Sequence, residues 1–342
     1  MRTNKKLLGL LFSLAAAVLT LLGGCQSEAS NSSVTTHSDR SGEPVTIKVA
    51  VDAAAFGLPF RVAIDQGYFQ KYGIDVQLST HAFGIDTLNA VITKQAEVGQ
   101  AMDFALLTRL DSGQLKVVAA IASPTSKNSR LVVRDGIQKP EDLKGKKLGV
   151  QRGTVQEYIW AKYLEKYSIK PDEVELLPMT SVSELLTAFT KGDISAFWVN
   201  KTFANDALQV PGALELADLT DINFRMVGFM AVDKTLLESN ELVVQNLLKG
   251  LEEANQSIKQ NPEHAAEVAF RELKLPKEDV LSEITYDYEF EVRFDQNDFD
   301  QLKSIHDWAL ANGLLEKEVN LEEAIEIGPI SEAFPDRVTY HN

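Results

Sequence analysis

The sequence predicts an α/β fold made of two similar lobes, each a mostly parallel sheet flanked by helices. From Val45 onward, runs rich in β-branched residues alternate with helical runs, which is the βαβ rhythm of a parallel sheet covered on both faces. The rhythm then recurs. Residues 68–78 are echoed by 163–176, and residues 88–103 (LNAVITKQAEVGQAMD) by 185–200 (LLTAFTKGDISAFWVN). Two echoes in the same order predict two lobes of similar build.

The N-terminal segment predicts export. Arg2, Lys5 and Lys6 precede an apolar run about as long as a signal peptide needs, and short for a spanning helix with polar flanks. We therefore expect residues 1–24 to be a signal peptide. Cys25, the only cysteine in the chain, follows directly.

The sequence LLGGC resembles the lipobox of bacterial lipoproteins. This resemblance implies that the thiol of Cys25 is joined to diacylglycerol, and that acyl chains such as palmitate anchor the protein in the membrane. The alternative is a soluble secreted protein that loses Cys25 with the signal. Residues 25–44 are rich in Ser, Thr, Asn and Gly, which is typical of a flexible tether. The folded body is then expected to begin near Val45.

Composition excludes several kinds of partner. The formal net charge is −15, and no basic face is visible, so nucleic acid is not an expected partner. A single cysteine allows no intramolecular disulfide. No Cys/His cluster has metal-ligand spacing, and neither a Gly-rich phosphate loop nor a nucleophile elbow is present. We therefore expect no metal, no cofactor and no catalytic residues.

Candidate binding residues follow from the predicted sheets, because ligands of open α/β sheets bind outside the carboxyl ends of the strands. If two such sheets face each other, loops from both converge on one cleft, a common place for a small-molecule site. In the first lobe the candidates are Phe56, Gly57, Phe83, Asp103 and Phe104. In the second lobe they are Arg152, Gly153, Thr154, Val155, Trp198 and Asn200.

The turn QRGTVQ carries the sharpest of these predictions. Gly153 lets a ligand approach the backbone, and Thr154 is a good N-cap for a helix that runs to about Tyr167. Free amides at residues 154–156 and the helix dipole would hold an anionic head. The alternative is an ordinary strand-to-helix turn. Arg152 could add a charged donor or point to solvent.

The other candidates each have two interpretations. Trp198 could stack on a ligand or fill the core of its lobe. Asp103 and Asn200 could bond a ligand or cap the helices that follow them, and capping is expected for at least one. Aromatic residues in or beside the cleft loops would form an apolar wall; these are Phe56, Phe83 and Phe104.

Four segments resemble, in order, the landmarks of periplasmic-type binding proteins for sulfonates, taurine, nitrate and thiamine-precursor pyrimidines. They are AIDQGYFQKYGIDVQL, EVGQAMDFALL, DLKGKKLGVQRGT and LLTAFTKGDISAFWV, and the resemblance covers Val45 to about Val232. It implies a type II, Venus-flytrap architecture. Lobe I would comprise residues 45–125 and 226–342, and lobe II residues 126–225.

The resemblance also implies how the chain connects its lobes. The outward crossing is expected near residues 122–130 and the return near residues 225–230. A helix that starts at Glu241 would then pack on lobe I, because its apolar residues fall at helical spacing. Its predicted core positions are Leu242, Val243, Leu247, Leu248 and Leu251.

Function follows from the same resemblance. It implies a monomeric, non-enzymatic solute-binding lipoprotein on the extracytoplasmic face of the cell membrane. Such a protein delivers its solute to the permease subunits of an ABC importer. The expected solute is an aliphatic sulfonate or taurine-like anion. The alternative is a pyrimidine thiamine precursor or another heteroaromatic compound. This alternative is favoured if several of the aromatic candidates, Phe56, Phe83, Phe104 and Trp198, face the cleft. Two alternatives of other classes are a pyrimidine-synthesis enzyme, for which only His81 lies near the cleft, and a sensor or adhesion lipoprotein.

Overall fold

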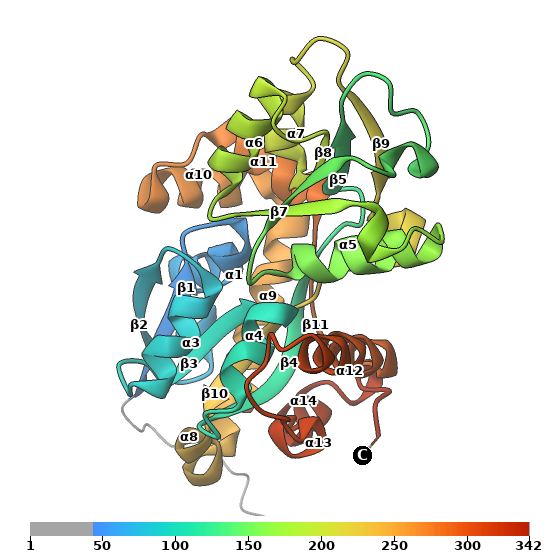
Figure 1. Ribbon diagram of the computed structural model, residues 1–342. Coiled ribbons are helices and arrows are strands. Elements are labelled where there is room, and N and C mark those ends of the chain that lie inside the picture. The colour runs from blue at the N-terminus through green and yellow to red at the C-terminus, as the bar shows by residue number, and fades with distance from the viewer. Residues whose placement is uncertain (1–43, 342) are drawn as a thin grey trace, which may run out of the picture. The chain divides into compact units, whose positions relative to one another are not determined.

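The strands form two separate sheets, in agreement with the repeated βαβ rhythm (Figure 1). The computed structural model describes residues 44–341, so the predicted signal peptide, Cys25 and all but the last residue of the predicted tether lie outside the described residues. The larger sheet, in the order β11-β4-β10-β3-β1-β2, consists of β1 (Val45–Asp52), β2 (Ile74–His81), β3 (Val98–Met102), β4 (Leu115–Pro124), β10 (Gly228–Asp233) and β11 (Tyr288–Arg293). The smaller sheet, in the order β7-β6-β8-β5-β9, consists of β5 (Ser129–Val133), β6 (Lys147–Gln151), β7 (Glu175–Met179), β8 (Ala196–Asn200) and β9 (Leu214–Asp218).

Both sheets are mixed rather than mostly parallel. Strand β1 pairs in parallel with β2 and β3, and β6 pairs in parallel with β7 and β8. Antiparallel pairs join β10 to β3 and β4, β11 to β4, and β5 to β8 and β9. Parallel neighbours need a long crossover connection, whereas β5 and β10 enter their sheets directly from the other sheet. These two strands can therefore run against their neighbours.

Helices surround both sheets (Figure 1). Those that precede or follow strands of the larger sheet are α1 (Leu58–Asp65), α2 (Tyr68–Lys71), α3 (Gly84–Ile92), α4 (Asp103–Leu110), α8 (Lys234–Ser239), α9 (Glu241–Gln260), α10 (Pro262–Leu273), α11 (Lys277–Ser282), α12 (Gln296–Ala311), α13 (Leu321–Ala324) and α14 (Gly328–Ala333). Those of the smaller sheet are α5 (Val155–Lys166), α6 (Val182–Lys191) and α7 (Lys201–Ala207). A π-helical turn, η5 (Glu283–Asp287), joins α11 to β11. No described helix combines the length and the apolar character that crossing a bilayer requires.

Helix α9 confirms the helix predicted from Glu241. Its residues Leu247, Leu248 and Leu251 are buried in the core of the larger sheet's half. Complete burial of such side chains contributes about 1.5–3 kcal/mol each. Leu242 was predicted to be core and is instead 60% exposed, because at 3.6 residues per turn it lies on the face opposite the buried stripe that begins with Val243 and Val244.

The chain crosses between the sheets twice, at residues 125–128 and 223–227. The first crossing lies where the sequence predicts it. The return lies slightly earlier than predicted, because β10 already begins at Gly228. The two crossings contact each other: Ser126 Oγ donates a hydrogen bond to the Phe224 carbonyl oxygen at 2.9 Å. The Leu219 amide, in the turn that precedes the return crossing, also donates to the Ser126 carbonyl oxygen at 3.1 Å.

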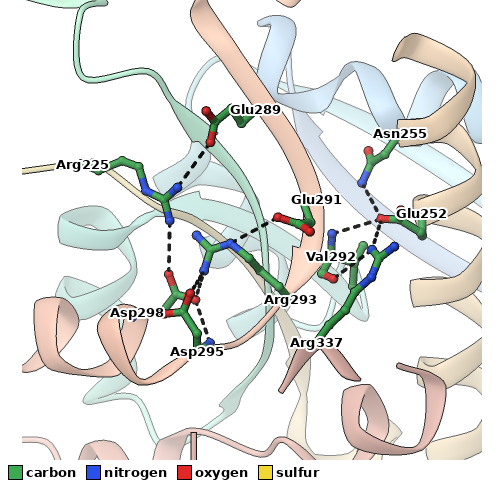
Figure 2. A network of polar contacts seen from close by, with 10 residues as sticks. All are labelled: Arg225, Glu252, Asn255, Glu289, Glu291, Val292, Arg293, Asp295, Asp298 and Arg337. Atoms are coloured by element: carbon green, nitrogen blue, oxygen red, sulfur yellow. Dashed lines mark hydrogen bonds and ion pairs between the residues drawn. The ribbon is translucent and has the colours of Figure 1, made fainter. Parts of the chain in front are cut away.

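Arg225 ties the return crossing to the larger sheet's half (Figure 2). Arg225 lies between Glu289 of β11, at 3.3 Å, and the buried Asp298 of α12, at 4.0 Å. Asp298 also pairs with Arg293, which bonds Asp295 at 2.9 Å. The burial of Asp298 makes its partners important, because a buried carboxylate without a counter-charge is strongly destabilising.

A close contact between β10 and the loop after β1 gives a test of this packing. A Cβ atom added at Gly228 would lie 2.5 Å from Cζ of Phe56, so Gly228→Ala must displace the ring. Overpacking of this kind costs about 1–3 kcal/mol, which urea unfolding would measure. Phe56→Leu in the same chain should recover part of that loss. Unchanged stability of Gly228→Ala would contradict the packing described.

Candidate binding cavity

A cavity of about 520 Å³ lies where strands of both sheets end. Met102 at the end of β3, Gln151 at the end of β6 and Asn200 at the end of β8 all line it. The crossings contribute Asn128 and Met226. The cavity therefore lies at the carboxyl ends of parallel strands, the position at which open α/β sheets bind ligands.

The start of α5 forms one part of the wall. Thr154 is its N-cap, and the Thr154 Oγ1 accepts a hydrogen bond from the Gln156 amide at 3.3 Å. The Gln151 amide donates to the Gln156 side-chain oxygen at 3.0 Å, and the Gly153 amide donates to the Glu157 carboxylate at 2.5 Å. Several amides that could hold an anion are thus already bonded to side chains of the helix itself.

The start of α7 forms a second part. Asn200 caps this helix, because its Oδ1 accepts a hydrogen bond from the Phe203 amide at 3.2 Å. The next residue, Lys201, places Nζ 3.1 and 3.0 Å from the two carboxylate oxygens of Asp287. Asp287 ends the π-helical turn η5, so this ion pair connects the halves built on the two sheets.

Helix α11 and the turn η5 form an acidic wall, which we define as Asp279, Glu283 and Asp287. Burial, as the largest cause, and the nearby carboxylates of Asp287, Asp52 and Asp279 together raise the pKa of Glu283 to about 7. Single π-helical turns are frequent at functional sites. Here the turn brings two carboxyl groups, four residues apart, to the same cavity.

Comparison with known proteins assigns the family. The family model described as "NMT1/THI5 like" matches residues 57–265, which is more than half of the chain. The chain belongs to this family. A binding protein of Brucella abortus (strain 2308) is 28% identical over 231 residues, covering 65% of this chain and 69% of that protein. The taurine-binding periplasmic protein of Escherichia coli (strain K12) is 25% identical over 225 residues, with the same two coverages.

A solved structure confirms the fold class predicted for this NMT1/THI5-like chain. The periplasmic aliphatic sulphonate binding protein SsuA of Escherichia coli superposes with a TM-score of 0.72. The alignment covers 83% of this chain and 92% of that one, at 18% sequence identity. The two-lobed architecture of periplasmic binding proteins is therefore the architecture of this chain.

Three of the predicted ligand-contact residues line the cavity: Thr154, Val155 and Asn200. The capping predicted for Thr154 is confirmed, and so is the expectation that at least one of Asp103 and Asn200 caps a helix. Thr154 and Asn200 thus cap their helices and also line the cavity.

Trp198 lies in the core and does not line the cavity. It is completely buried, and its ring meets Trp160 and Tyr163 edge to face, with centroids 6.1 and 5.4 Å away. Trp198 lies two residues before Asn200 in β8, at a point where the strand is still covered by the hydrophobic core. Of the two interpretations of Trp198 that the sequence allows, the structure supports the core.

Asp103 is also buried away from the cavity. Its carboxylate accepts hydrogen bonds from the amides of Phe104, at 2.8 Å, and Val227, at 3.2 Å, and from the Gln301 side chain at 3.3 Å. Burial raises its pKa to about 6. Asp103 therefore holds the start of α4 to the return crossing and to α12.

The phenylalanines do not form the predicted apolar wall of the cavity. Phe56 and Phe104 are buried in the core, and Phe83 is 69% exposed at the start of α3. Gly57 packs against β1, because an added Cβ would lie 2.6 Å from the Asp52 carbonyl oxygen. None of these four residues lines the cavity. They belong to the packing or to the surface of the larger sheet's half.

Arg152 and Gly153 lie outside the cavity as well. Arg152 is exposed, the solvent-facing alternative that the sequence allows for it. Gly153, at a φ of +73°, provides the left-handed turn before α5 and borders a separate hollow beside Leu314 and Leu315. The turn QRGTVQ therefore contributes to the cavity only from Thr154 onward, together with Gln151.

The candidate binding residues predicted from the sequence include neither Lys201 nor the acidic wall, although both line the cavity. Lys201 follows Asn200 directly, so its place at a helix start beside the cavity could have been inferred. The acidic wall had no such signal, because Asp279, Glu283 and Asp287 lie in a region that matches the family motifs poorly. Only tertiary packing brings them to the strand ends.

The raised pKa of Glu283 makes stability depend on pH. The pKa is 4.5 in an ordinary environment and about 7 in the fold, so its contribution to stability is complete below pH 4.5 and is lost as the pH rises through 7. At pH 8 the loss is about 3 kcal/mol. Relative to the parent chain, Glu283→Gln should therefore gain about 2–3 kcal/mol in free energy of unfolding between pH 4.5 and pH 8.

Urea unfolding at both pH values, followed by tryptophan fluorescence, measures this difference. Glu278→Gln is the matched control, because Glu278 is an exposed carboxyl group on the adjoining helix α11 and does not line the cavity. An effect of Glu283→Gln that is the same at both pH values would contradict the burial described.

Proposed function

We propose that this chain is the solute-binding component of an ABC importer and that its solute occupies the cavity between the two sheets. One observation carries the proposal: in a chain of this family, strand ends from both sheets converge on one cavity of about 520 Å³. A cavity of this size suits a small organic molecule. Closure of the two halves around the solute would then present the loaded form to the permease.

The proposed solute carries a small anionic head of the sulfonate class. Lys201 is the cation of the cavity's lining, and Thr154, Asn200 and Thr202 add polar side chains beside it. The printed names of the relatives, a taurine-binding and an aliphatic sulphonate binding protein, support this class. A heteroaromatic solute was favoured only if several of four aromatic residues faced the cleft, and Phe56, Phe83, Phe104 and Trp198 do not line the cavity.

The proposal includes a lipid anchor on the N-terminal segment, a monomeric state and binding without catalysis. Attachment through a lipid on Cys25 would keep the binding protein at the extracytoplasmic face of the membrane, close to its permease. We propose that it acts as a monomer by binding alone, with residues 45–125 and 226–342 as one lobe and residues 126–225 as the other.

Isothermal titration of the full chain with short alkanesulfonates and aminoalkanesulfonates tests the proposal. We expect at least one of them to bind, and Lys201→Met to weaken that binding at least ten-fold, because a hydrogen bond to a charged group contributes about 1.5–3 kcal/mol. Lys191→Met is the matched control, since Lys191 is an exposed lysine of the same half that does not line the cavity. No binding of any organosulfonate, or equal losses in both variants, would contradict the proposed solute class.

A further inference from the structure

We propose that Asp287 is an internal competitor of the solute: its carboxylate holds Lys201 in the place that an anionic head would take, and it thereby limits how tightly an anion binds. The inference rests on the proposed function, because it concerns the same cavity. It adds to that function an autoinhibitory contact built from the chain's own residues.

The cavity offers an anion little free positive charge. Lys201 is the only lysine or arginine among its lining residues in the described part of the chain. Both carboxylate oxygens of Asp287 accept hydrogen bonds from Lys201 Nζ, at 3.1 and 3.0 Å. A lysine has three N–H donors, so at most one of them remains for a solute. Since an ion pair of this kind has no net charge, it also attracts an incoming anion only weakly.

The main chain fixes both members of this ion pair at the first crossing. The Asp287 carbonyl oxygen accepts a hydrogen bond from the Thr125 amide at 2.9 Å. The Lys201 amide donates to the Asn128 side-chain oxygen at 3.3 Å. One crossing therefore keeps the carboxylate within reach of the lysine. A partner held in this way competes at a high effective concentration, because it cannot diffuse away.

An anion that displaces Asp287 leaves a buried carboxylate behind. Asp287 is only 8% exposed, and within the described residues Lys201 is the one side chain that donates a hydrogen bond to its carboxylate. Its nearest acidic neighbour is Glu283, whose pKa is raised partly by the charge of Asp287. A buried carboxylate that loses its counter-charge is strongly destabilising. The solute must offset this loss through its contacts with the rest of the lining.

Removal of the competing carboxylate tests the inference. Isothermal titration would compare the parent chain with Asp287→Asn, using ethanesulfonate, propanesulfonate and 2-aminoethanesulfonate as probes. We expect Asp287→Asn to bind at least one probe at least ten-fold more tightly, because a neutral amide leaves the charge of Lys201 to the solute. A merely structural role of Asp287 would instead weaken binding.

Asp206→Asn is the matched control. Asp206 is an exposed aspartate on α7, the helix that begins with Lys201, and it does not line the cavity. This variant removes the same charge without releasing the lysine, so we expect it to change binding less than two-fold. An equal gain in both variants would show a general effect of charge and would overturn the inference.

A crystal structure of the parent chain with its tightest-binding probe gives a second measurement, which does not depend on any variant. We expect a sulfonate oxygen within about 3.2 Å of Lys201 Nζ. At least one carboxylate oxygen of Asp287 should then lie beyond hydrogen-bond distance from the same nitrogen.

The remaining outcomes separate the two claims. If the probes bind the parent chain and Asp287→Asn binds them equally or more weakly, the inference is overturned while the proposed function stands. The same holds if both Asp287 oxygens stay bonded to Lys201 in the complex. If no probe binds either chain, the proposed solute class fails and the inference fails with it. Circular dichroism of Asp287→Asn verifies that the variant is folded.

Discussion

The hydrogen bonding between the two crossings is the constraint on which the cavity depends. Ser126 of the first crossing bonds the Phe224 carbonyl of the second, and Asp103 holds the adjacent Val227 amide from the larger sheet's half. Arg225 is fixed on the same side by Glu289 and Asp298 (Figure 2). Because the crossings are short and bonded to each other, the strand ends of both sheets lie close together. Side chains from both sheets can therefore line one cavity.

Two contacts bridge the two halves, one of them in the lining of the cavity. Lys201 at the start of α7 bonds Asp287 of η5, and Tyr158 of α5 shares a 2.9 Å hydrogen bond with Ser304 of α12. Both contacts would have to break for the halves to separate. Lys201 of the cavity lining is thus already paired with Asp287. In the proposed complex an anionic head would share Lys201 with Asp287, which would couple binding to closure through one side chain.

Local chemistry made part of the site predictable from sequence. Thr154 and Asn200 are good N-caps directly after strands, so their position at the strand ends follows from short-range signals. Trp198 and Asn200 show the limit of such signals, because two residues along β8 separate a buried ring from a cavity-lining amide. The duplicated position of Asn200, Asp103, has a different environment, since Asp103 is buried and bonded by Gln301 of α12, whereas Asn200 is exposed. The acidic wall was unpredictable for a related reason: α11 and η5 reach the cavity only through the packing of a segment far along the chain.

Hydrogen exchange of backbone amides, with and without the tightest-binding sulfonate, tests the central claim that one solute contacts both halves. The account predicts that protection increases together in three segments, residues 154–159, 200–205 and 279–287, and stays unchanged around the exposed Phe83. Protection confined to one half, or no change in any of the three, would contradict it.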